Sequence, residues 1–264
     1  MPDVFNLDSL TAILTEAAAQ ALGFFDTLGQ RSVEAKSPGD LVSDADRAVE
    51  QTLRQRLTEA FPDCTILGEE YGGSPTARFW SIDPIDGTRN FLSGLPFWTV
   101  SLGLVQDGQP AAGGIVAPAL GLSVLGAPGQ PLRTTGFTSG SRPADPQSLG
   151  LGRNPRWPAA DRHAVEAAAE AAGLSPRLIG SCALSLMLVA TGRLKGYVEA
   201  RVGGLWDCAG GLALCRAAGL PTAFKLHPDG TVDVLAGDVF AIARAAGWQG
   251  GILNTWRTLA WTGA

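Results

Sequence analysis

Strand-forming segments are concentrated in the middle of this chain, and this position limits the folds that the chain can adopt. Short apolar runs separated by glycine and proline predict strands at Cys64–Leu67, Phe79–Ile82, Phe97–Val105, Ala112–Val116 and Leu122–Leu125. Asp107-Gly108 favours a tight hairpin turn between the third and fourth of these strands. Strands clustered in this way, with helices on either side, predict an α+β layered sandwich rather than a regular βαβ repeat.

Helical periodicity precedes and follows the strands. Apolar residues recur every three or four positions in two N-terminal segments, which predicts helices over 9–28 and 44–61. Asp8 or Ser9 is the expected cap of the first helix and Gly29 its stop, and residues 30–42 are expected to form a loop or a short hairpin. Farther along, we predict helices at 161–172, 183–191, 207–218 and one or two within 239–261, with strands at 177–179 and 197–199.

The segment Gly136–Pro158 is rich in Gly, Ser, Pro and Arg, and we predict that it joins two lobes. On this interpretation residues 1–140 form an N-terminal α+β lobe and residues 141–264 form a C-terminal α/β lobe. The functional motifs described below fall in both parts, so we expect the second lobe to complete a site that the first lobe begins.

Composition excludes several classes of partner. Hydrophobic residues make up 45% of the chain and charged residues 17%, which favours a compact globule over disorder. Twenty Lys and Arg against 25 Asp and Glu give a net charge of −5, so neither a nucleic acid nor an anionic membrane is an expected partner. The same charge would repel a phosphorylated substrate unless metal ions reversed the local field.

The N-terminus and the cysteines carry no targeting or zinc-binding signal. Met1–Leu10 has no basic segment, and the apolar stretch that follows is broken by polar residues, so we expect a cytoplasmic protein. The 4 cysteines form no CxxC pair and only 2 histidines accompany them, which disfavours zinc. We expect the thiols to be free and to pack as small hydrophobic groups.

The segment Asp83–Thr88 carries the most informative pattern in the sequence. We expect the strand to end at Asp83 and the chain to turn immediately after it, so that the carboxylates of Asp83 and Asp86 can converge. The carbonyl of Ile85 could then supply a third oxygen ligand, and hard oxygen ligands suit Mg²⁺. Gly87 follows and could open a helical turn whose free N–H groups bind an anion.

Carboxylates that bind metal, placed beside amides that bind phosphate, are what phosphoryl transfer to water requires. The alternative is that the two Asp dipeptides of this segment are ordinary turn sequences.

Acidic residues elsewhere add to this pattern, each with a structural alternative. Glu69 follows a predicted strand, but Gly68-Glu69-Glu70 could be a solvated loop. Asp207 begins a strongly apolar helix, where it could simply cap the helix, although a carboxylate in such surroundings needs a partner that a metal could supply. Asp46 lies three residues after Ser43, in a pattern that resembles a capping box.

Together these blocks resemble the inositol monophosphatase family. The similarity runs from about Leu10 to Gly219 and rests on four blocks in the family's order: Asp40–Asp46, Gly68–Glu70, Asp83–Thr88 and Trp206–Gly211. The resemblance implies an α+β fold in which layers alternate as an αβαβα sandwich. It also implies a lithium-sensitive homodimer that hydrolyses a small phosphate ester, most simply inositol monophosphate or a related sugar or polyol phosphate.

The resemblance further implies a site with two or three Mg²⁺ ions. One ion would be held by Glu69, Asp83 and the carbonyl of Ile85. A second would be held by Asp86 and Asp207, with Asp83 bridging the two ions.

Other residues would act on the water and the substrate. Asp46 and Thr88 would orient and deprotonate the attacking water, with Glu69 close by, and the amides of Gly87 and Thr88 would bind the phosphate. The reaction would be a direct in-line attack without a phosphoenzyme. Substrate hydroxyls would meet Glu199 and Asp207, in a pocket lined by the backbone of Gly180, Ser181 and Cys182.

The chain departs from the family's pattern outside the proposed metal ligands. The loop 127–131 is short, Lys195 stands where an acidic residue is common, Arg201–Gly204 replaces a shorter run, and Leu220-Pro221 lacks an expected glycine. These positions leave the substrate and the oligomeric state open.

Several alternatives are consistent with the sequence. Within the family, the activity could be that of a 3′(2′),5′-bisphosphate nucleotidase, a histidinol-phosphate phosphatase or a fructose-1,6-bisphosphatase. A haloacid-dehalogenase type of phosphatase is disfavoured because its D-x-D spacing is absent around Asp83. A non-catalytic binding protein would be expected to lack a ligand residue, yet every ligand type is present.

Overall fold

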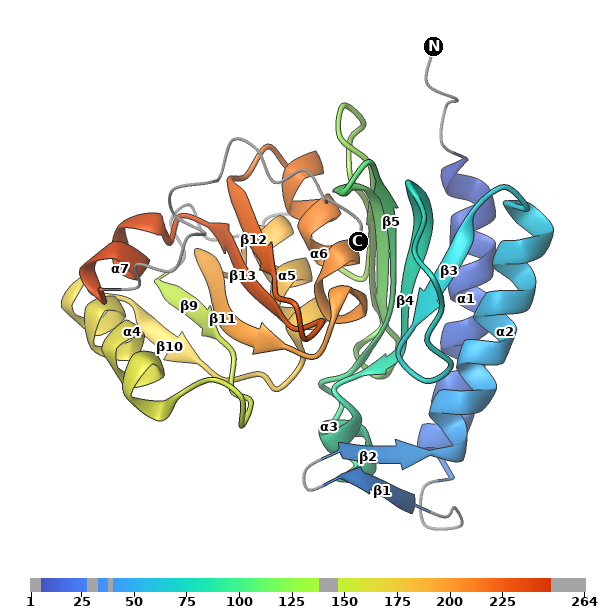
Figure 1. The fold of residues 1–264 in the computed structure, drawn as a ribbon, viewed down its shortest axis with the longest axis horizontal. Coiled ribbons are helices and arrows are strands. Elements are labelled where there is room, and N and C mark those ends of the chain that lie inside the picture. Colours follow the sequence, from blue (N-terminus) through green and yellow to red (C-terminus); the bar gives the residue numbers. More distant parts are fainter. Residues whose placement is uncertain (1–5, 28–32, 38–39, 138–146, 248–264) are drawn as a thin grey trace.

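The structure is a computed structural model that describes residues 6–27, 33–37, 40–137 and 147–247. Helices and sheets alternate in five layers (Figure 1). Across the molecule these layers are α1 and α2, a six-stranded sheet, α5 and α6, a five-stranded sheet, and α4 with α7. The predicted α+β class and the layered αβαβα arrangement are therefore confirmed.

The six-stranded sheet follows the chain order and carries the first part of the site. Its strands are β3 (Thr65–Gly68), β4 (Arg78–Asp86), β5 (Thr99–Gln106), β6 (Gln109–Ala117), β7 (Leu122–Gly126) and β8 (Arg133–Thr135). Only the β3–β4 pair is parallel among these neighbours. Asp107 and Gly108 have φ values of 49° and 71°, which confirms the hairpin turn predicted between β5 and β6.

Two N-terminal helices cover the outer face of this sheet. In α1 (Leu7–Phe25) the side chain of Asn6 accepts hydrogen bonds from the N–H groups of Asp8 (3.0 Å) and Ser9 (3.2 Å). The helix therefore begins before residue 9, and its cap is Asn6 rather than Asp8 or Ser9. The predicted stop at Gly29 lies outside the described residues. The helix α2 (Asp44–Ala60) matches its prediction and buries an apolar face. The short hairpin β1 (Val33–Ser37) and β2 (Asp40–Ser43) precedes it.

The five-stranded sheet carries the second part of the site. Its order is β10 (Ser175–Arg177), β9 (Ser148–Leu151), β11 (Gly196–Val202), β13 (Val232–Gly237) and β12 (Thr222–Leu226). Between the sheets lie α5 (Cys182–Ala190) and α6 (Leu205–Ala217), which are buried on nearly all sides. The outer face carries α4 (Ala159–Ala171) and α7 (Phe240–Ala245).

Several sequence-based boundaries need correction. The segment 136–158 is not only a connection, because it contains the buried strand β9, while residues 138–146 lie outside the described part. The strand predicted at 177–179 is found at 175–177, and β8, β12 and β13 were not predicted. Only α7 of the predicted C-terminal helices falls within the described residues. The division into lobes at residue 140 stays a prediction.

In the part of the chain that the structure describes, no helix is both long enough and apolar enough to span a membrane.

Candidate active site

The site begins at the end of β4, where the strand is irregular. The strand does not end at Asp83, as predicted, but continues to Asp86. Asp83 pairs with Ser101 and Asp86 pairs with Thr99, so three steps along β4 match two steps along β5. Pro84 explains the irregularity, because it has no N–H to donate to the ladder. The extra residue returns both aspartates to the same face of the sheet, where a regular strand would separate them.

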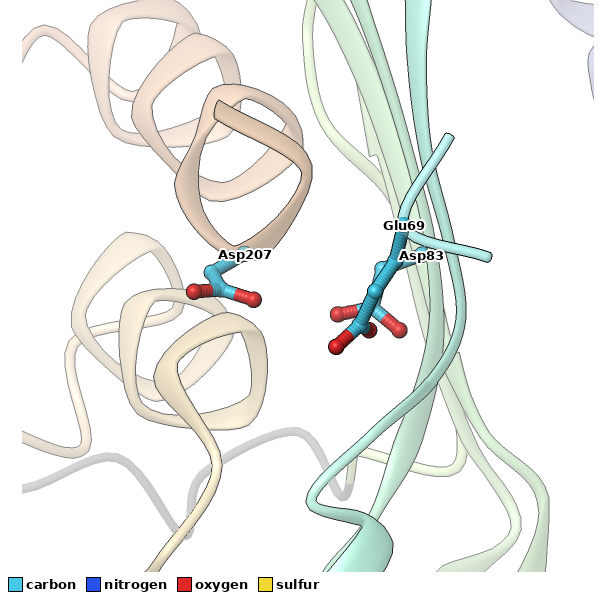
Figure 2. Close-up of side chains that lie close together, drawn as sticks. All are labelled: Glu69, Asp83 and Asp207. Atoms are coloured by element: carbon cyan, nitrogen blue, oxygen red, sulfur yellow. The ribbon is translucent and has the colours of Figure 1, made fainter. Parts of the chain in front are cut away.

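Three carboxylates from different elements converge on this face. Oxygen atoms of Glu69, Asp83 and Asp207 all lie within 4.8 Å of one another. Figure 2 shows Asp207 extending from the start of α6 toward Glu69 and Asp83 on the sheet. Glu69 is brought there because β3 runs parallel to β4, with Gly68 beside Ile82. We call these three residues the acidic cluster.

The acidic cluster is suited to a divalent cation. One oxygen of Asp83 accepts a hydrogen bond from the N–H of Ile85 (3.0 Å), whereas the other is buried without a hydrogen-bond partner among the described residues. Such an oxygen is costly to bury unless something binds it. The donors are all carboxylate oxygens, which is the ligand type that Mg²⁺ prefers. These residues therefore fit the metal that the sequence predicts.

Electrostatics supports the same conclusion. Burial, followed by the neighbouring carboxylates, raises the pKa of Glu69 and Asp83 well above the ordinary range. Burial, followed by the negative charge of Asp207, raises the pKa of Asp86 to about 7. Burial, followed by the negative charge of Glu199, raises the pKa of Asp207 to about 6. A divalent cation would relieve this repulsion and restore the charged carboxylates.

Asp86 also joins β4 to α5. Its carboxylate accepts hydrogen bonds from the hydroxyl of Ser181 and from the N–H of Ala183 (2.7 Å). The Ser181 hydroxyl in turn accepts from the N–H of Leu184 (3.0 Å) and caps α5. The sequence analysis assigned only the backbone of Ser181 to the pocket, so this side-chain contact is a new finding.

Glu50 is a site residue that the sequence analysis missed. It is buried on α2, and its carboxylate accepts hydrogen bonds from the N–H groups of Glu70 (2.7 Å) and Tyr71 (3.2 Å) and from Nε of Arg54 (2.7 Å). A methyl group on Gly68 would lie 2.1 Å from Glu50 Oε1, so a larger residue there would displace the Glu50 carboxylate. Glu50 thus holds the loop that carries Glu69. The sequence feature that could have identified Glu50 is its position four residues after Asp46, which places both carboxylates on the same side of the helix α2.

Asp46 acts electrostatically on the acidic cluster, and Thr88 contacts Ile85. Asp46 is buried in the first turn of α2, and its charge raises the pKa of both Glu69 and Asp83, after the larger effects of burial and nearer carboxylates. Thr88 opens the short helix α3 (Thr88–Leu92), and its hydroxyl donates to the carbonyl of Ile85 (3.1 Å). The role of Asp46 and Thr88 in water activation stays a prediction.

A cavity of about 130 Å³ adjoins the cluster. Asp86 and Asp207 line it, as do Gly180, Ser181, Cys182 and Glu199, which the sequence analysis assigns to the pocket. The other lining residues are Tyr197, Val202, Gly203, the segment 152–154 and Arg156. Gly87 and Thr88 are not among the described residues that line it.

Glu199 is more deeply engaged than the sequence indicates. Its two carboxylate oxygens accept hydrogen bonds from the side chain of Asn154 (2.8 Å) and from the hydroxyl of Tyr197, and burial raises its pKa. A carboxylate has further lone pairs, so Glu199 can still accept from a substrate hydroxyl.

Comparisons with known proteins agree with this geometry. The model of the inositol monophosphatase family matches residues 6–260. An uncharacterized protein, y4fL, of Sinorhizobium fredii is 44% identical over 88% of this chain and 84% of its own length. An inositol-1-monophosphatase of Mesorhizobium japonicum is 35% identical over 80% of this chain and 81% of its own length. The crystal structure of the extragenic suppressor protein suhB from Bartonella henselae superposes with a TM-score of 0.78 at 26% identity, covering 93% of this chain and 99% of that one. The chain belongs to the inositol monophosphatase family.

Proposed function

From this family membership, we propose that the chain is a Mg²⁺-dependent phosphatase that hydrolyses a small sugar or polyol phosphate, with inositol monophosphate as the simplest candidate. The observation that carries the proposal is the acidic cluster of Glu69, Asp83 and Asp207, placed beside a small cavity. A carboxylate site of this kind has little use in a pure binding protein, because it needs a cation before it can accept an anionic ligand.

We assign the metal ligands as the sequence predicts them. Glu69, Asp83 and the carbonyl of Ile85 would hold one Mg²⁺, and Asp83, Asp86 and Asp207 would hold a second, within a set of two or three ions. When bound, such ions lower the pKa of water and neutralise charge on the phosphoryl group. The unpartnered oxygen of Asp83 supports its role as the ligand that both ions share.

The protein's own groups would orient the attacking water. The hydrogen of the Thr88 hydroxyl is held by the Ile85 carbonyl (3.1 Å), which leaves the lone pairs of Oγ1 able to accept a hydrogen bond from the attacking water and to orient it. The carboxylates of Asp46 and Glu69 are then available to take a proton from that water. The N–H groups of Gly87 and Thr88 are proposed to bind the phosphate, and the left-handed conformation of Gly87 (φ 97°) starts the turn that presents them.

The cavity would hold the leaving group. Glu199, fixed by Asn154 and Tyr197, is positioned to accept hydrogen bonds from substrate hydroxyls, and Asp207 borders the same space. Gly180, Ser181 and Cys182 would close the wall. The small volume of about 130 Å³ favours a compact substrate.

Three further properties are proposed from the family and the composition. We propose that the protein acts as a homodimer, that it is cytoplasmic and that Li⁺ inhibits it by competing for a Mg²⁺ position. Light scattering in solution tests the first, and phosphate release at increasing Li⁺ tests the last. An activity insensitive to Li⁺ would contradict this assignment.

The test of the proposed function is phosphate release from a panel of substrates. Inositol 1-phosphate, fructose 1,6-bisphosphate, histidinol phosphate and 3′-phosphoadenosine 5′-phosphate would each be incubated with Mg²⁺ and with a chelator. We expect Mg²⁺-dependent release from the sugar or polyol phosphates. Equal release in the presence of chelator, or no release from any compound, would overturn the proposal.

A further inference from the structure

Two arginine side chains, those of Arg153 and Arg156, line the cavity that adjoins the acidic cluster. Arg153 and Arg156 belong to the segment that follows β9, and both border the same space as Glu199.

The backbone that presents these arginines is held in place. The side chain of Asn154, which lies between them, donates to Glu199 Oε1 and to the carbonyl of Ala200, both at 2.8 Å. Its oxygen accepts from the N–H groups of Arg156 (2.9 Å) and Trp157 (3.1 Å). With its amide fully used, Asn154 fixes the loop against β11.

Arg156 is anchored by an irregularity of β11. Its Nε donates to the carbonyl of Arg201 (3.1 Å), a residue with a φ of 60° at a register shift of the strand. The N–H of Arg201 is held by Asp233 (3.0 Å). A methyl group on Gly203 would lie 3.0 Å from Asp207 Oδ2 and 3.5 Å from Arg156 Nη2. The guanidinium of Arg156 therefore lies beside the cavity and close to Asp207, a proposed metal ligand.

The charges that line the cavity would not balance once metal is bound. Asp86 and Asp207 line it as proposed ligands of the cations, so Glu199 is the remaining carboxylate among its described lining residues, and it already accepts hydrogen bonds from two neutral groups. Arg153 and Arg156 line the same cavity, which leaves one formal positive charge in excess among these three residues. Arginine also presents several N–H groups in a fork that matches carboxylate and phosphate oxygens.

We propose that Arg153 and Arg156 bind a second anionic group on the leaving part of the substrate, either a second phosphate or a carboxylate. The inference rests on the proposed function and narrows it to sugar or polyol phosphates that carry such a group. The same charges disfavour a cationic leaving group such as an amino alcohol.

The test compares substrates that differ only in the second group. One pair is glycerol 3-phosphate and 3-phosphoglycerate, and the other is fructose 1-phosphate and fructose 1,6-bisphosphate, all assayed with Mg²⁺. We expect kcat/KM to be roughly tenfold higher for the anionic member of each pair, as one charge-assisted hydrogen bond allows. Arg153→Gln and Arg156→Gln should each raise KM for the anionic member about tenfold more than KM for the neutral member.

Arg244→Gln, on the exposed surface of α7, is the matched control and should change neither constant. Equal kcat/KM within both pairs would overturn the inference and leave the proposed function intact. A rise in KM that is the same for both members would also overturn it, because the arginines would then act on the shared phosphate or on the carboxylates nearby. Absence of Mg²⁺-dependent release from all four compounds would overturn the proposed function and this inference together.

Discussion

The acidic cluster and the loop of Arg153 and Arg156, which we call the acidic end and the basic end of the site, are held by different kinds of structure. At the acidic end, Asp83 lies on a central strand, Asp207 on a buried helix and Glu69 directly after a strand of the same sheet. At the basic end, Arg153 and Arg156 lie on one loop, whose position depends on Asn154 and on the irregular end of β11. The acidic end therefore belongs to the core elements, whereas the basic end is a loop that hydrogen bonds hold against the core.

This difference predicts a division of roles. Catalytic metal ligands must keep their geometry to within a fraction of an ångström, which rigid elements provide. Residues that select a leaving group can vary without disturbing the core, so a loop suits them. Changes at the acidic end should therefore reduce kcat, and changes at the basic end should raise KM.

The largest effect is expected at Asp83. Asp83→Asn removes the shared negative charge but keeps the shape of the side chain, so the protein should fold while turnover falls by roughly a thousandfold or more. Phosphate release and circular dichroism would be measured together. Asp63→Asn, at an exposed position, is the control. Turnover close to that of the wild type in Asp83→Asn would break the assignment of the acidic end.

The second largest effect is expected at Glu50, which is not a proposed metal ligand but holds the loop that carries Glu69. The two carboxylate oxygens of Glu50 accept hydrogen bonds from three donors, whereas Glu50→Gln keeps only one acceptor oxygen. The substitution also removes the ion pair between Glu50 and Arg54. We expect the Mg²⁺ concentration for half-maximal activity to rise by roughly 10- to 100-fold, as for other residues that position metal ligands.

The same helix supplies a control for Glu50. Arg56 forms exposed ion pairs with Glu16 (2.9 Å) and Glu59 (3.1 Å), so Arg56→Gln should leave both the Mg²⁺ requirement and the stability nearly unchanged. If Glu50→Gln folded and required no more Mg²⁺ than the Arg56 variant, Glu50 would have no positioning role.

A smaller effect, of a different kind, is expected at the basic end. Asn154→Ala removes four hydrogen bonds that hold the loop and leaves a Glu199 oxygen without its donor. We expect KM to rise by about tenfold, because the arginines lose their fixed position, while kcat changes little. Steady-state kinetics would decide this point, and a fall in kcat with unchanged KM would contradict the division of roles.

The smallest effect concerns the stability of the metal-free protein. The pKa of Asp86 is raised from 3.8 to about 7, so this group binds more protons in the folded than in the unfolded state between these values. The free energy of unfolding should therefore fall as pH rises across that window. We expect the Tm in chelator to decrease by several degrees between about pH 5 and pH 8, and Mg²⁺ to restore it at the higher pH. A Tm that rose with pH in chelator would contradict the description of the acidic end.

The two ends also differ in how far the sequence predicts them. The acidic residues lie in short local blocks, and the resemblance of these blocks to those of the family, rather than spacing alone, predicted that Glu69, Asp83 and Asp207 share one site. The supporting contacts join distant segments: Ser181 and Asp86 are 95 residues apart, and Asn154 and Glu199 are 45 apart. Local patterns carry no signal for such pairs.

The fold shows the same limit. The strands that are apolar runs between glycine and proline, and the helices up to Ala217, were predicted close to their observed positions. The strand β9 was not, because Ser148–Leu151 is short and lies in a stretch rich in glycine and proline. The continuation of β4 to Asp86 was also missed, since Pro84 normally indicates the end of a strand and is tolerated here only through a register shift.

The most direct test of the central claim is to locate the metal. Crystals grown or soaked with Mn²⁺ in place of Mg²⁺ would give an anomalous difference map that marks each bound ion. We predict a peak between the carboxylates of Glu69, Asp83 and Asp207 that disappears in the Asp83→Asn variant. Full Mn²⁺-dependent activity with no peak at these three carboxylates, or with a peak elsewhere, would contradict the account.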